Sequence, residues 1–238
     1  MRKKTNLSSN YSKKSRPKSM IKFVIFHYTG MQSEIESIHR LKNPKSKVSC
    51  HFLINLKGEV IQMVKENKVA WHAGKSKWKK YTNLNNHSIG IELVNKGHRF
   101  GYRSFPKRQI KSLISLCKIL KSNYKIRTEN FLGHSDIAPL RKIDPGEKFP
   151  WKNLSKFQFG HWHKIGKNSL NYSKDKTVFF KNLYKIGYRY FKINKRTRAD
   201  RRVIRAFQQR YYPQNVTGNL DQKTYKISHF LANINKKT

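Results

Sequence analysis

Acidic side chains are scarce in this sequence of 238 residues, which has 12 Asp and Glu residues against 53 Lys and Arg and a formal net charge of +41. Such an excess of positive charge suits a polyanionic partner, either nucleic acid, an anionic envelope surface or a carboxylate-bearing polymer. Lysine dominates the excess, however, and the basic residues run through the whole chain without forming one stripe interleaved with aromatic residues. Genome composition accounts for this pattern as well as selection does, and without such a stripe we expect no nucleic-acid partner.

Long apolar runs are also missing. The longest, such as residues 23–26 and 89–94, have the length of a strand, whereas a helix that spans a membrane needs about 20 apolar residues. Residues 1–20 are polar and basic, and they lack the apolar segment of a secretory signal. We therefore expect a flexible basic arm over residues 1–20 and a cytoplasmic protein. The alternative is a periplasmic, envelope or secreted protein whose export signal is of another kind or lies outside this chain.

Cysteine is represented only by Cys50 and Cys117, which are too few for a disulfide scaffold. Each lies in an apolar pattern, so we expect both to be small core residues. A nucleophile–base pair of Cys50 and His51 is disfavoured because neighbours in a strand point to opposite faces.

The hydrophobic pattern predicts one mixed α/β catalytic domain over residues 21–160, in which a central mixed β-sheet is flanked by helices. It indicates buried strands at residues 21–26, 89–94 and 131–133, a hairpin of residues 51–56 and 59–64, and helices at 31–41 and 106–124. Turn residues then accumulate, which predicts a linker over residues 161–176. Residues 177–238 read as a small helical domain, with a helix at 199–211 and another that begins at Asp221. A unit of this size usually needs support from a neighbour.

Three polar residues stand at the end of an apolar strand or in the loop that follows one: His27, His134 and Asp144. Two imidazoles and one carboxylate form a sensible ligand set for a catalytic zinc ion, with a fourth position left for water or substrate. Spacing alone does not establish this site, because the three residues are far apart and each also fits a capping or hydrogen-bonding role. Two acidic residues of this sparse set lie within apolar segments, Glu92 and Asp144, and each needs an explanation.

Short motifs surround these positions, and together they resemble a known family. They are residues 26–30 (FHYTG), 47–52 (KVSCHF), 70–74 (AWHAG), 83–92 (NLNNHSIGIE), 133–139 (GHSDIAP) and 141–146 (RKIDPG), the last followed by FPW at 149–151. In this order, and over about residues 21–155, they resemble the AmpD/AmiD-type N-acetylmuramoyl-L-alanine amidases. One departure is Leu140, which stands where many relatives have a small residue, and it leaves the shape of that loop open.

The resemblance implies one catalytic zinc ion bound by His27, His134 and Asp144. Glu92 matches the residue that activates the attacking water, and Lys142 matches the lysine that stabilises the developing oxyanion. These roles make chemical sense, because a carboxylate can relay a proton and an ammonium group can offset negative charge.

Other residues of the motifs are not ligands in the family pattern. We expect Trp71 and His72 to line the substrate cleft, with packing as the alternative. His51 is expected in the core or behind the ligands, and Asp136 is expected to order its loop.

The C-terminal segment resembles, more loosely, the peptidoglycan-binding helical domain of AmiD-type members, through residues 186–188, 206–210 and 218–221. The alternative is a helical extension that only packs against the amidase. The resemblance therefore predicts a monomeric enzyme that cuts the amide between N-acetylmuramic acid, or its 1,6-anhydro form, and L-alanine. Its substrate would be peptidoglycan or a muropeptide, in cell-wall degradation or recycling. The rival is a protein of the same fold that binds peptidoglycan without cutting it, and Glu92 and Lys142 argue against it.

Overall fold

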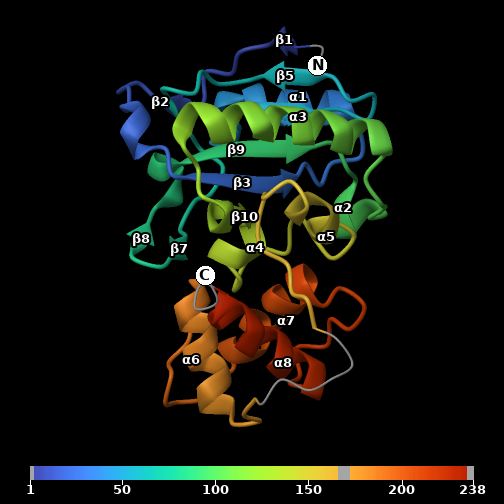
Figure 1. The fold of residues 1–238 in the computed structure, drawn as a ribbon. Coiled ribbons are helices and arrows are strands. Elements are labelled where there is room, and N and C mark those ends of the chain that lie inside the picture. The colour runs from blue at the N-terminus through green and yellow to red at the C-terminus, as the bar shows by residue number, and fades with distance from the viewer. Residues whose placement is uncertain (1–2, 166–171, 235–238) are drawn as a thin grey trace.

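The computed structural model describes residues 3–165 and 172–234. Within these residues the main sheet has six strands, and its mixed character and its flanking helices confirm the predicted fold class (Figure 1). Strands β3, β4, β9 and β10 run parallel, whereas β5 is antiparallel to β4. In spatial order the strands are β1 (Lys3–Thr5), β5 (Val60–Gln62), β4 (Phe52–Ile54), β9 (Ser88–Leu93), β3 (Phe23–Tyr28) and β10 (Phe131–Gly133).

The two central strands, β3 and β9, each have one apolar face and one face that carries polar residues, at the end of β3 and at both ends of β9. Their register pairs Phe23 with Ser88 and His27 with Glu92. Because side chains alternate along a strand, Ser88, Gly90 and Glu92 share one face of β9, and Phe23 and His27 share the same face of β3. The polar groups of two neighbouring strands are thereby placed side by side.

Helices cover both faces of the sheet, as the packing clusters show. Helix α3 (Lys107–Tyr124) buries its apolar side, which includes Cys117, against the face of Val24 and Phe26. Helix α1 (Glu34–Lys42) packs on the opposite face, beside Cys50 and Leu53. Both cysteines are thus core residues, as predicted. The shorter elements are β2 (Tyr11–Ser12), β6 (Val69–Ala70), β7 (Lys77–Trp78), β8 (Tyr81–Thr82), α2 (Gly97–Phe100), α4 (His134–Ile137) and α5 (Trp151–Ser155).

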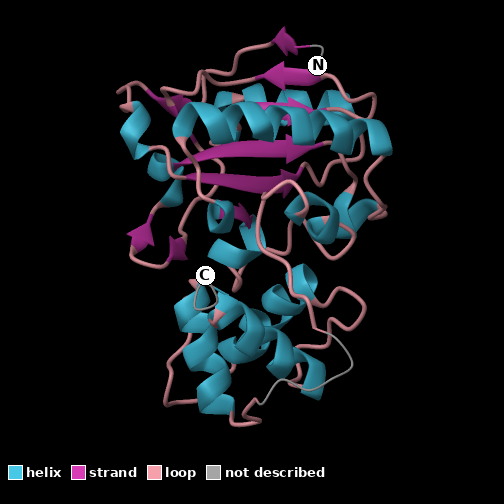
Figure 2. Cartoon of the chain, viewed as in Figure 1, coloured by secondary structure: helices cyan, strands magenta, loops and turns pink. Residues whose placement is uncertain are grey.

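Three C-terminal helices lie beyond the β10 edge of the sheet, and Figure 2 shows them as an all-helical layer. They are α6 (Lys176–Ile186), α7 (Ala199–Tyr211) and α8 (Gln222–Ala232), and Asp175 and Asp221 cap the first and the last of them. Their apolar side chains do not form a separate core. Phe179 and Phe207 belong to the same buried cluster as Phe23 and Ile25 of β3. The helices therefore complete the core of the sheet domain.

Residues 3–16 are packed onto the domain, which differs from the flexible arm expected over residues 1–20. Strand β1 pairs with β5, and β2 pairs with β6. The Arg16 side chain is 5% exposed and donates to the carbonyls of Glu66 and Asn85. Polar and backbone hydrogen bonds order this segment, and hydrophobic periodicity does not detect such bonds.

The longer predicted elements are confirmed with small shifts of their ends, including the hairpin around Gly58 and the helix at residues 199–211. His134 was expected in a loop, yet it begins the one-turn helix α4. Of the predicted linker at residues 161–176, residues 166–171 lie outside the described part. Before them Trp162 packs on the core, and after them α6 already begins at Lys176. Among the described residues, no helix is long and apolar enough to cross a membrane.

The shared core gives a test of stability. Phe207 is fully buried in the common cluster, so Phe207→Ala should lower the free energy of unfolding by about 3–5 kcal/mol. Ile35, which is 71% exposed, provides the control, and Ile35→Ala should change it by less than about 0.5 kcal/mol. Urea denaturation followed by circular dichroism and by tryptophan fluorescence measures both. An effect of Phe207→Ala as small as that of the control would contradict a shared core.

Candidate metal centre and active-site cavity

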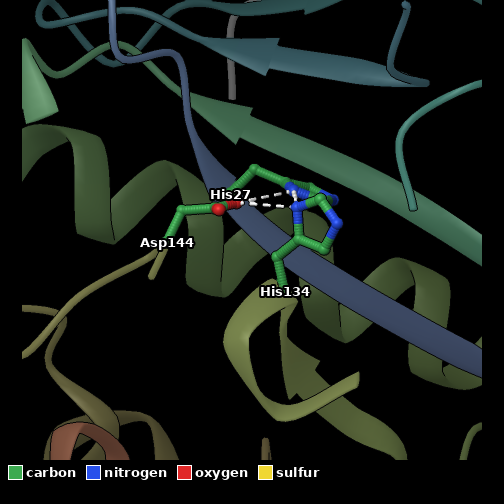
Figure 3. Close-up of side chains that lie close together, drawn as sticks. All are labelled: His27, His134 and Asp144. Atoms are coloured by element: carbon green, nitrogen blue, oxygen red, sulfur yellow. Dashed lines mark hydrogen bonds and ion pairs between the residues drawn. The ribbon is translucent and has the colours of Figure 1, made fainter. Parts of the chain in front are cut away.

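Three side chains from different parts of the chain converge at one end of the parallel strands. His27 lies near the end of β3, His134 follows β10 directly, and Asp144 lies in the loop after α4 (Figure 3). The Oδ2 atom of Asp144 is 2.9 Å from Nδ1 of His27 and 3.0 Å from Nδ1 of His134, and the two Nδ1 atoms are 3.0 Å apart. The structure therefore brings together the three residues proposed from the sequence as metal ligands.

A chain of hydrogen bonds fixes the tautomer of His27. The Ser88 hydroxyl donates to the Leu84 carbonyl at 2.6 Å, so its oxygen accepts from Nε2–H of His72 at 3.2 Å. Nδ1 of His72 then carries a lone pair and accepts from Nε2–H of His27 at 3.0 Å. In the neutral ring of His27, the lone pair consequently lies on Nδ1, which faces Asp144. Burial lowers the pKa of His27 to about 4, with the neighbouring His134 adding to the effect, so this ring is neutral at pH 7.

The second imidazole is oriented in the same way. Nε2 of His134 lies 3.1 Å from the carbonyl oxygen of Ala73, which can only accept, so in a neutral ring Nδ1 carries the lone pair. Burial by itself would raise the pKa of Asp144, but His134 and His27 hold it well below its usual value. The carboxylate is thus ionised at pH 7.

Three electron-pair donors, two nitrogens and one oxygen, therefore face one another at 2.9–3.0 Å. Such an arrangement is repulsive unless a positive charge, either a proton on one imidazole or a metal ion, lies between the donors. Two imidazoles and one carboxylate are the donor types of catalytic zinc sites. Hydrogen bonds from the far nitrogen of each imidazole are the usual means of orienting such ligands. The residues present thus fit a zinc ion.

His72 is held in place from several sides. Its backbone N–H and that of Ala73 both donate to Oδ1 of Asn85, at 3.0 and 2.7 Å. Gly90 of β9 provides the space for the ring, because a Cβ at this position would lie 2.4 Å from Cγ of His72. Asn85, Ser88 and Gly90 of the motif at residues 83–92 therefore all help to place the imidazole of His72 behind His27.

A cavity of about 500 Å³ opens in front of the three ligands, and Glu92, Lys142, Trp71 and His72 also line it. Glu92 is partly buried, and its Oε2 atom has no hydrogen-bond partner among the described residues. Burial raises the pKa of Glu92 to about 8, with a further contribution from Asp144. A cavity of this size with convergent polar groups and a shifted carboxyl has the properties of an enzyme active site.

Trp71 and His72, the two residues expected to contact substrate, differ in how far they can do so. Both ring nitrogens of His72 are engaged by His27 and Ser88, so the ring has no free hydrogen-bonding group for a substrate. Trp71 remains a predicted contact. His51 is fully buried, and its Nδ1 accepts from the backbone of Gly90. The role of Ser88 was not foreseen, although the polar alternation of β9 was a signal that could have suggested it.

Comparisons with known proteins agree with this geometry. A sequence family described as N-acetylmuramoyl-L-alanine amidase matches residues 16–147. The amidase AmiD of Escherichia coli is 35% identical over 230 residues, which cover 89% of this chain and 82% of AmiD. The 1,6-anhydro-N-acetylmuramyl-L-alanine amidase AmpD of Haemophilus influenzae is 39% identical over 107 residues, and the match spans 44% of this chain and 56% of that relative.

Solved structures extend the likeness to more than nine tenths of the chain. The E. coli AmiD structure, a complex with anhydro-N-acetylmuramic acid-L-Ala-D-γ-Glu-L-Lys, has a TM-score of 0.79 and 33% identity and covers 92% of this chain and 91% of its own. AmpDh3 of Pseudomonas aeruginosa, in complex with anhydromuramic pentapeptide, has a TM-score of 0.80 and 27% identity and covers 96% and 97%. Together with the sequence match over more than half of its length, these similarities show that the chain belongs to the N-acetylmuramoyl-L-alanine amidase family.

Proposed function

We propose that this protein uses one zinc ion, held by His27, His134 and Asp144, to hydrolyse the amide between N-acetylmuramic acid and L-alanine. Membership of the amidase family provides the reaction class. The observation that carries the metal is the convergence of three lone pairs at 2.9–3.0 Å. The two imidazoles and the carboxylate leave a fourth position open toward the cavity.

The substrate class is inferred from relatives. The AmiD and AmpDh3 structures hold anhydro-muramyl peptides, and the likeness to this chain extends over both its sheet domain and its C-terminal helices. We propose that the present cavity accepts the same class of ligand, with the amide placed beside the three ligands. The whole polymer and released muropeptides both contain this bond, and we propose that the protein acts as a monomer in wall degradation or recycling.

Glu92 and Lys142 are proposed as the catalytic side chains. When bound, a zinc ion would polarise the amide carbonyl and the attacking water, and its charge would favour the ionised form of Glu92. Glu92 then accepts a proton from the water and delivers it to the nitrogen of the leaving L-alanine. Lys142 lines the same cavity, and its ammonium group offsets the negative charge that develops on the former carbonyl oxygen.

Separate variants distinguish metal binding from catalysis. Removal of the metal with a chelator, or the substitution His134→Ala, should abolish both bound zinc and activity. Glu92→Gln should retain zinc and lower kcat about 100- to 10,000-fold, because only proton transfer is lost. Zinc content by elemental analysis and release of L-alanyl peptide from anhydro-muropeptide measure the two effects. Unchanged activity in metal-free protein would refute the proposal, and wild-type activity in Glu92→Gln would refute the role of Glu92.

The hydrogen-bond chain from Ser88 through His72 to His27 can be tested by a substitution that leaves all three proposed ligands in place. Ser88→Ala removes the acceptor for Nε2–H of His72 and should weaken zinc binding about 10- to 100-fold, as losses behind metal ligands do. Ser122, which is exposed on α3, provides the matched control, and Ser122→Ala should leave the affinity unchanged. Competition with a chromophoric chelator measures both constants. Equal affinities of the two variants would show that the chain does not tune the ligand.

A further inference from the structure

Asp136, which lies two residues after His134, is the point at which the C-terminal helices reach the metal site. Its carboxylate is fully buried and accepts the backbone N–H of Gly133 at 2.7 Å. It also accepts the hydroxyl of Tyr188 at 2.5 Å and forms an ion pair with Arg210. Gly133 and Asp136 lie before and after His134 in the chain, so the C-terminal partners of Asp136 hold the short segment that carries this ligand.

Arg210 of α7 makes a second contact, with strand β10 just before His134. It is 2% exposed, and its Nη2 donates to the carbonyl of Phe131 at 2.9 Å. Its guanidinium carbon lies 4.0 Å from the ring centroid of Trp151. One guanidinium group therefore connects α7 to strand β10 and to helix α4, the two elements that meet at His134. Because the guanidinium group is planar and rigid, its two hydrogen bonds fix the direction as well as the distance between these elements.

The Asp144 loop has its own attachment to the same helices. The Leu140 carbonyl accepts from Nη1 of Arg202 on α7 at 2.7 Å. The Leu140 side chain packs against the cluster that α6, α7 and α8 share with the sheet. The backbone N–H of Ser135 donates to the Asp144 carbonyl at 2.8 Å, which joins the two ligand loops.

We propose that the C-terminal helices are a positioning element of the metal centre, which sets the separation of His134 and Asp144 by holding Asp136 and Leu140. This inference rests on the proposed zinc site. The contacts described here join the helices to the residues beside the ligands, so Tyr188, Arg202 and Arg210 act through Asp136 and Leu140. Metal sites depend on such support, because small displacements of a ligand weaken binding.

The polar character of these contacts indicates that they fix the position of the loop beside His134, in addition to holding the helices against the sheet domain. Apolar side chains of similar volume can stabilise an interface as well as a buried ion pair does. The interface here contains a carboxylate with three directional donors within an apolar cluster. Such a network fixes one arrangement of the loop, whereas apolar packing alone permits small shifts.

Two mild variants and one strong variant test the proposal in the full chain. Tyr188→Phe removes one donor to Asp136, and the double variant Leu140→Ala/Arg202→Ala detaches the Asp144 loop. Arg210→Met removes the ion pair and carries a risk of misfolding, so the first two keep the test decisive. Each mild variant should weaken zinc binding about 10- to 100-fold. The visible absorption of the cobalt(II)-substituted protein, which reports ligand geometry, should also change.

Two control variants distinguish an effect on the position of the metal ligands from an effect on the stability of the fold. Arg201 is also exposed on α7, and Arg201→Ala should leave zinc affinity and the cobalt spectrum unchanged. Ile227 is buried in α8 within the shared cluster, and Ile227→Ala should lower the melting temperature without changing zinc affinity below the melting range. Arg210→Lys, which keeps the charge, should bind zinc more tightly than Arg210→Met.

The outcomes are distinguishable. If the wild-type chain binds no zinc, the proposed function fails, and this inference fails with it. If the wild type binds zinc and the folded mild variants bind it equally well with an unchanged cobalt spectrum, only the positioning role is overturned. A loss of affinity in Ile227→Ala that is as large as that in the mild variants would also overturn it, because stability alone would then explain the effect.

Discussion

Mutual repulsion of three lone pairs is the constraint on which this site depends. Two imidazole nitrogens and one carboxylate oxygen lie within 3.0 Å of one another, and the surrounding hydrogen bonds leave no freedom for the rings to turn away. On one side the constraint runs from the Leu84 carbonyl through Ser88 and His72 to His27. On the other side the Ala73 carbonyl holds His134. A metal ion bound between the three atoms, as proposed, would relieve this repulsion.

The parallel pairing of β3 with β9 makes the arrangement possible. It places His27 directly beside Glu92 and places Ser88 at the start of the same face. A central strand with one polar face would ordinarily weaken a core, but here the polar residues are used in the site and apolar clusters lie to either side. Helix α1 covers the β4 side, and the C-terminal helices cover the β10 side. The cavity opens beside α1, whose Ser37, Arg40 and Leu41 contribute to its lining.

Much of this architecture could be predicted from local patterns. The apolar runs at β3 and β9 and the helical spacing of α3 and α7 gave elements that the structure retains within a few residues. The candidate ligands came from ordered motifs, because spacing alone does not bring residues 27 and 134 together. The ion pair of Asp136 with Arg210 spans 74 residues, and neither periodicity nor composition encodes such a contact. The ordered segment at residues 3–16 was missed because it is polar and its strands are two or three residues long.

The hydrophobic cluster that the sheet shares with the C-terminal helices has a consequence for folding during synthesis. Chains are made from the N-terminus, so all three ligands, Glu92 and Lys142 emerge from the ribosome before Tyr188 and Arg210 exist. Until then Asp136 lacks its ion-pair partner, and Phe23 and Ile25 lack the helices that cover them. Under the proposed positioning role, a nascent chain that already contains the three ligand residues still lacks the contacts that hold them. It gains these contacts only once Tyr188 and Arg210 have been made.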